Sequence, residues 1–204
     1  MSSISGKPGV TFYAVMFVML FLTTVLHELT HLLTALALGV DTFAFGLGRV
    51  SLRPPADFEW QATLISISGP LFTLTMGLFG AWLAIGRKIA FGYDLVFVAF
   101  YQRLLAMTMS IVTGNHNDEA RVSLDLGLPW WGLPSVFIAV LAAALFLSSR
   151  RLRFGFLVLF LSYVTASLGY TLLIYLDGQL PGQGLCDSIM APFYDPAFGC
   201  AADA

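Results

Sequence analysis

The amino-acid sequence predicts an all-α membrane protein, a bundle of about five transmembrane helices. Two observations support this fold class. Of the 204 residues, 58% are hydrophobic and only 11% are charged, whereas about a quarter of the residues in a soluble domain are charged. In addition, five stretches are apolar over roughly 20 residues, the length needed to cross a bilayer. Backbone groups in lipid must pair within their own segment, so these stretches are predicted to be helices.

The predicted spans run approximately over Val10–Leu38, Thr63–Ile85, Ile89–Thr113, Trp130–Leu147 and Phe154–Leu176. We interpret the chain as one membrane domain, residues 1–204, with a core at residues 10–125, two further spans at residues 130–176 and a polar tail at residues 177–204. The first span is too long for a signal peptide and contains two histidines and a glutamate, so we expect it to be retained. Ten basic residues against twelve acidic ones give no positive surface for a nucleic-acid partner.

Basic residues in the short loops predict the orientation of the chain. With five spans, six of them fall on one side: Lys7, Arg87, Lys88, Arg150, Arg151 and Arg153. Only Arg49, Arg53 and Arg121 fall on the other. We therefore expect an integral protein of the bacterial inner membrane, with a cytoplasmic N-terminus and an exported C-terminal tail. In an oxidising compartment Cys186 and Cys200 would form a disulfide, whereas in a cytoplasmic tail they would stay reduced.

The first span contains the sequence His27-Glu28-Leu29-Thr30-His31. Residues four apart lie on one face of a helix, so both histidines can bind the same ion. Zinc accepts two such ligands, needs a third from the protein and keeps one position open for water. The carboxylate of Glu28 stands beside that position, where it can move a proton to and from the water. Ionisable groups are costly inside a bilayer unless they are paired or metal-bound. The pattern therefore predicts a Zn²⁺ site with Glu28 as the catalytic residue.

The loop from Val40 to Ala62 alternates at first, with Phe43, Phe45 and Leu47 on one side. This period is typical of a strand, and residues 49–53 supply a second arm before a Pro-Pro pair. The segment is interpreted either as a short re-entrant β segment or as an amphipathic loop on the membrane surface.

Polar residues interrupt the third span, and a Gly-Pro pair interrupts the second. Asp94 and Arg103 lie nine residues apart on one predicted helix, too far apart to contact each other, so each needs a partner on another element. In the second span, Gly69 permits close helix approach and Pro70 removes a backbone donor.

These features resemble the site-2 protease family of intramembrane zinc metalloproteases. The resemblance covers residues 10–125, a metalloprotease-like core, and depends on the histidine pentad, the Gly69-Pro70 pair and the polar segment after the third span. It implies that the protein cleaves transmembrane or juxtamembrane segments of other membrane proteins by means of zinc-activated water. The bilayer and a membrane-protein substrate are then its expected partners.

The family's third zinc ligand is an aspartate, usually within an Asp-Gly sequence. This chain has no Asp-Gly there and reads Gly114-Asn115-His116-Asn117-Asp118-Glu119. We predict that His27, His31 and Asp118 bind the metal, with His116 and Glu119 as alternatives to Asp118. Another interpretation needs no metal, because Asn117 could cap a short helix that begins at Asp118.

Two other functions stay open at this point. The missing Asp-Gly and the small size are compatible with a non-proteolytic, zincin-like accessory subunit of a larger membrane complex. A metal or ion transporter would place polar residues in several spans, and only the third span has them. The charge count also disagrees with the resemblance about orientation, because it places the histidines nearer the exported face while the family places zinc toward the cytoplasm.

Overall fold

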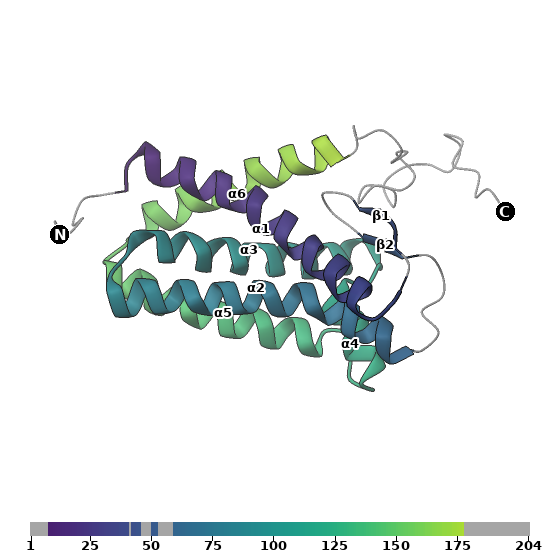
Figure 1. Cartoon of the computed structure of the whole chain (residues 1–204). Coiled ribbons are helices and arrows are strands. Elements are labelled where there is room, and N and C mark those ends of the chain that lie inside the picture. The colour runs from purple at the N-terminus through teal and green to yellow at the C-terminus, as the bar shows by residue number, and fades with distance from the viewer. Residues whose placement is uncertain (1–7, 41, 46–49, 53–58, 178–204) are drawn as a thin grey trace.

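The computed structural model describes residues 8–40, 42–45, 50–52 and 59–177. The elements follow in the order α1 (Val10–Ala37), β1 (Thr42–Phe45), β2 (Val50–Leu52), α2 (Glu59–Arg87), α3 (Ala90–Thr113), α4 (Asp118–Asp125), α5 (Gly132–Leu152) and α6 (Phe156–Asp177) (Figure 1). Every helix except α4 is long and apolar enough to cross a membrane. The prediction of five membrane-length apolar helices is confirmed, and these helices fit an integral membrane protein.

Two helices extend beyond their predicted ends. α2 begins at Glu59 instead of Thr63, and α5 continues past Leu147 to Leu152. The prediction followed the apolar stretch, but a helix continues into the polar region until the backbone changes conformation. α5 ends where Arg153 adopts a left-handed φ of 59°.

The bundle is built on the antiparallel pair α2 and α3, which share its most extensive contact. Their backbones approach closely because two glycines meet: a Cβ on Gly80 would lie 2.7 Å from the carbonyl oxygen of Gly92. Helix α1 packs across α2 and α3 and meets α6 at Gly169, where a Cβ would lie 3.2 Å from Leu20 Cδ1. The buried core joins side chains of all five long helices, including Met16, Ala81, Phe97, Leu145 and Leu173.

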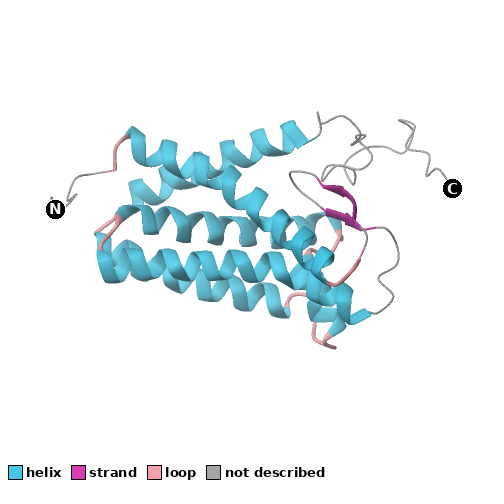
Figure 2. Cartoon of the chain, viewed as in Figure 1, coloured by secondary structure: helices cyan, strands magenta, loops and turns pink. Residues whose placement is uncertain are grey.

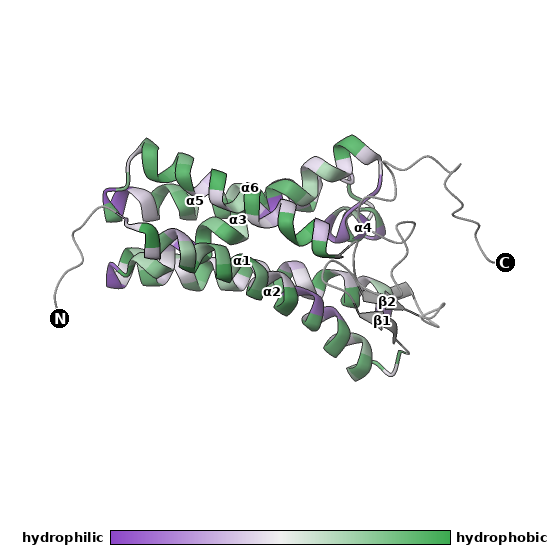
Figure 3. Ribbon diagram, turned by 90° about the horizontal axis from the view of Figure 1, so that it is seen from above, coloured by the Kyte–Doolittle hydropathy of each residue, from purple (hydrophilic) through white to green (hydrophobic). Residues whose placement is uncertain are grey.

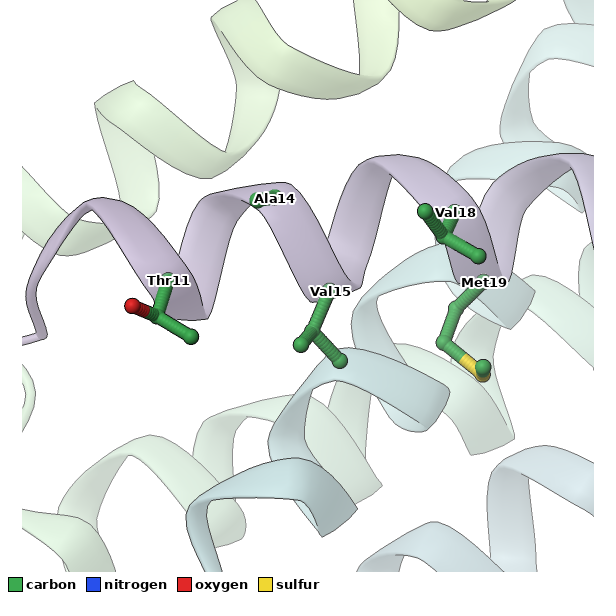
Figure 4. Close-up of a pocket in the computed structure, with 5 residues that line it drawn as sticks. All are labelled: Thr11, Ala14, Val15, Val18 and Met19. Atoms are coloured by element: carbon green, nitrogen blue, oxygen red, sulfur yellow. The ribbon is translucent and has the colours of Figure 1, made fainter.

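Many large hydrophobic side chains are exposed on the outside of the bundle, and Figure 3 shows that most residues of the long helices are hydrophobic. An apolar depression on α1 is an example, lined by Thr11, Ala14, Val15, Val18 and Met19 from a single helix (Figure 4). Val18 is 59% exposed, which suits contact with lipid acyl chains.

Basic residues gather at one end of the bundle, where the turns α2–α3 and α5–α6 lie side by side (Figure 1). Arg151 Nε donates a hydrogen bond to the carbonyl oxygen of Ile85 at 3.1 Å and joins the two turns. The strands and α4 lie at the opposite end (Figure 2).

Strands β1 and β2 form a short antiparallel pair, with Thr42 opposite Leu52 and Phe45 opposite Val50. A bulge lies between Thr42 and Ala44. The re-entrant position of this segment stays a prediction. Arg49, Arg53 and the tail with Cys186 and Cys200 lie outside the described residues, so the disulfide also stays a prediction.

Candidate metal centre

The two histidines of the pentad lie one turn apart on the buried face of α1. His27 is 4% exposed and His31 is 6% exposed. Their rings are nearly perpendicular, and the two Nε2 atoms lie 3.2 Å apart. The helical spacing read from the sequence therefore brings both imidazoles to one point inside the bundle.

Asp118, at the start of α4, brings its carboxylate to the same point from the segment that follows α3. α3 ends at Thr113, and the C-cap residue Gly114 turns the chain back with a left-handed φ of 73°. Asn117 then caps α4, because its side-chain oxygen accepts a hydrogen bond from the Ala120 N–H at 2.9 Å. In the first turn of α4, Asp118 Oδ2 lies 3.3 Å from His31 Nε2 and 3.6 Å from His27 Nε2. The structure therefore contains both the helix cap and the cluster of candidate metal ligands, which the sequence analysis treats as alternatives.

Hydrogen bonds to α2 determine which nitrogen of each imidazole carries the proton. His31 Nδ1 lies 2.6 Å from the carbonyl oxygen of Ile65, which can only accept, so Nδ1 is the donor. His27 Nδ1 lies 2.9 Å from Thr73 Oγ1, whose own proton goes to the Gly69 carbonyl oxygen. Both neutral rings are thereby protonated at Nδ1, and each turns the lone pair of Nε2 toward the other ring and toward Asp118.

Three electron-pair donors thus converge with no proton between them. The ligand atoms of His27, His31 and Asp118 form a triangle with sides of 3.2, 3.3 and 3.6 Å. A tetrahedral zinc with bonds of ~2.0–2.1 Å separates its ligands by about 3.3 Å. Two imidazoles and one carboxylate are also a ligand set that zinc prefers. The residues present therefore fit a zinc ion.

The charge around the triangle favours a divalent cation. Glu28 lies beside His31, and Asp118 and Glu119 lie beside Arg103, so within this described cluster three carboxylates and one guanidinium leave a formal charge of −2. The two neutral imidazoles beside Asp118 turn lone pairs toward it and add no balancing positive charge.

Helix α2 has a glycine, Gly69, where it packs against the imidazole rings of His27 and His31. A Cβ on Gly69 would lie 2.7 Å from His27 Cε1 and closer still to His31 Nε2. Sequence reasoning assigned this glycine to close helix approach and missed Thr73 and Ile65 as partners of the histidines. The position of Thr73, one turn after Gly69, was a usable signal. A backbone carbonyl such as that of Ile65 leaves no trace in the sequence.

Glu28, His116 and Glu119, the other residues predicted at the site, lie in different surroundings. Glu28 is 7% exposed and interacts electrostatically with His31. His116 stacks on Trp130, with ring centroids 5.7 Å apart, and lies outside the triangle. Glu119 points to Arg103 at 2.8 Å. Of the three residues considered as third ligand, the structure brings only Asp118 to the two histidines.

The triangle is open on one side. The side chains of His27 and His31 are 5% and 8% exposed, but that of Asp118 is 34% exposed. Solvent therefore reaches the cluster at the side chain of Asp118.

Comparison with known proteins gives one partial match. Over 65 residues, the chain is 40% identical to a protein of Synechocystis sp. that is provisionally named a zinc metalloprotease. The match covers 29% of this chain and 17% of that protein, so the chain spans less than a fifth of its relative. No protein-family model matches the chain. No solved structure matches it either.

Replacing the third ligand should remove the metal. We expect about one zinc per chain in the detergent-purified wild type and little zinc in Asp118→Ala, because two imidazoles alone bind zinc weakly. His116→Ala serves as the control and should keep its zinc. Elemental analysis of protein purified without chelators tests this, and zinc retained in Asp118→Ala but lost in His116→Ala would reassign the ligand.

The hydroxyl behind His27 should also affect zinc affinity. Thr73→Val removes the acceptor for His27 Nδ1 and should weaken zinc binding by about 10–100-fold. Thr75→Val is a matched control on the same helix, because Thr75 is exposed and bonds only the Leu71 carbonyl oxygen in the structure. Competition with a coloured chelator measures both affinities. Equal affinities for the two variants would contradict this role of Thr73.

Proposed function

We propose that this protein is an intramembrane zinc metalloprotease of the site-2 type, which cleaves transmembrane or juxtamembrane segments of other membrane proteins. The observation that carries the proposal is the zinc-sized triangle of His27, His31 and Asp118 inside a bundle of membrane-length helices. The carboxylate of Glu28 is buried beside it. The partial likeness to a provisionally named zinc metalloprotease supports the same class of activity.

Each residue of the candidate site has a role in the proposed peptide hydrolysis. His27, His31 and Asp118 would hold the zinc ion, which would supply Lewis acidity to a bound water and to the scissile carbonyl. Glu28 accepts the proton that the attacking water loses and later delivers it to the departing amine nitrogen. Thr73 and the Ile65 carbonyl hold the imidazoles in the required tautomer.

The substrate must reach this site in an extended form, because a helix hides its peptide bonds. The paired strands β1 and β2 lie at the same end of the bundle as α4 (Figure 1). We infer that this segment re-enters the membrane and that its free edge holds the substrate chain by backbone hydrogen bonds. Specificity would then depend mainly on which membrane segments can unwind.

The proposed proteolytic activity can be tested on a substrate protein with one transmembrane span that contains a helix-breaking Gly-Pro pair. In proteoliposomes, wild type should cleave it and Glu28→Gln should be slower by about 10²–10⁴-fold while keeping its zinc, because only the proton carrier is lost. Equal amounts of product from the two zinc-loaded proteins would refute proteolysis. That result would favour the accessory subunit of a membrane complex instead.

The orientation follows from the basic end of the bundle. Because basic residues stay cytoplasmic, we infer that the α2–α3 and α5–α6 turns face the cytoplasm of a bacterial inner membrane. The metal centre then lies nearer the exported face, together with the C-terminal tail.

A membrane-impermeant maleimide tests this orientation in intact cells. In a background with serine at positions 186 and 200, Leu126→Cys should be labelled directly, because Leu126 is 60% exposed at the metal end. Lys88→Cys should react only after permeabilisation. The reverse labelling pattern would place the metal centre on the cytoplasmic side.

A further inference from the structure

A buried ion pair joins α3 to α4 next to the metal centre. Arg103 Nη1 lies 2.8 Å from Glu119 Oε1, and the two side chains are 4% and 1% exposed. Within the described part of the chain, Arg103 Nε and Glu119 Oε2 have no hydrogen-bond partner. The proposed hydrolysis uses neither side chain, so the pair needs a separate explanation.

Stability alone is a poor explanation for such a pair. Taking two charges out of water is costly, and apolar residues of similar size often serve a buried site equally well or better. The cost is greater here because each partner also buries an unpaired polar atom. A buried ion pair is better justified where it imposes one specific arrangement on the elements it joins.

We propose that the Arg103–Glu119 ion pair is a positioning device that sets the rotation of α4 and thereby directs Asp118 toward His27 and His31. The inference rests on the proposed metal site and adds two residues that do not touch the metal.

The geometry of a short helix gives the reason. Glu119 follows Asp118 directly, so their side chains leave α4 about 100° apart. With Glu119 anchored in the core by Arg103, Asp118 is turned toward the histidines. A rotation of α4 by about 20° would move a carboxylate at roughly 6 Å from the axis by about 2 Å. This displacement equals a zinc–ligand bond length, so Asp118 would no longer reach the ion.

The other polar contacts that the structure describes between α4 and the spans lie at the ends of α4, while Ala120 and Val122 bury its apolar face. At the start, the Asn117 N–H donates to Ser110 Oγ at 3.0 Å. At the last residue, Thr63 Oγ1 donates to Asp125 Oδ2 at 2.6 Å. Ser123 Oγ, also in the last turn, accepts from the Leu133 N–H at 2.8 Å. In the first turn of α4, the side chain of Glu119 is held by Arg103 of the span α3. Glu119 is also the residue next to the candidate ligand Asp118.

The test removes the pair without leaving a buried charge. The double variant Arg103→Met/Glu119→Leu keeps apolar volume in the core and should unfold in detergent at the same temperature as wild type or higher. Its zinc affinity, measured with a competing chelator, should nevertheless fall by about 10–100-fold, the range seen when supporting contacts of metal ligands are lost. Cobalt(II) in place of zinc should show a weaker visible absorption band, because the tetrahedral arrangement loses Asp118.

Asp125→Asn is the matched control, because it weakens another polar contact of the same helix to a span. It should bind zinc and cobalt as wild type does. Zinc affinity and cobalt absorption at wild-type levels in the double variant would overturn the positioning role and leave the proposed function intact. A wild type that binds no zinc would overturn both. If the double variant does not fold, the swapped pair Arg103→Glu/Glu119→Arg decides: restored zinc binding supports positioning by the pair, and folding without zinc binding contradicts it.

Discussion

The two hydrogen bonds from the histidines of α1 to α2 are the constraint on which the metal centre depends. Each Nδ1 proton is committed to an oxygen of α2, at Ile65 for His31 and at Thr73 for His27. Both Nε2 lone pairs must then face the same volume, where the Asp118 carboxylate also points. Such a cluster of acceptors repels itself without a cation, so the packing of α1 on α2 already prepares a site for one.

The cost of polar groups in an apolar bundle explains where they occur. Arg103 and Glu119 pair with each other, and the histidines bond α2, all near the end of the bundle that carries α4. Apolar side chains cover the outer faces, where lipid is the neighbour. The polar groups of the candidate metal centre are therefore gathered in one interior region, where the side chain of Asp118 is partly exposed, whereas Asp94 is buried near the start of α3, at the other end of the bundle.

The segment after α3 shows how one local feature can serve two purposes. Asn117 caps α4 as its residue type predicts, and the cap fixes the start of the helix so that Asp118 lies in its first turn. The left-handed Gly114 reverses the chain just before it. The Asp-Gly sequence of the resembled family is absent here, yet the aspartate still reaches the histidines. The position of a ligand in space matters more than the residue that follows it.

By itself, the sequence determined the five apolar helices and the spacing of His27 and His31, because hydrophobic length and helical period are local properties. It also limited the third ligand to His116, Asp118 or Glu119. Only the tertiary structure decided among these three, since the choice depends on how far α4 rotates and on which side chain Arg103 captures. The partners of the histidines on α2 were likewise beyond the sequence, because a backbone carbonyl and a threonine more than thirty residues away meet them only when the helices pack.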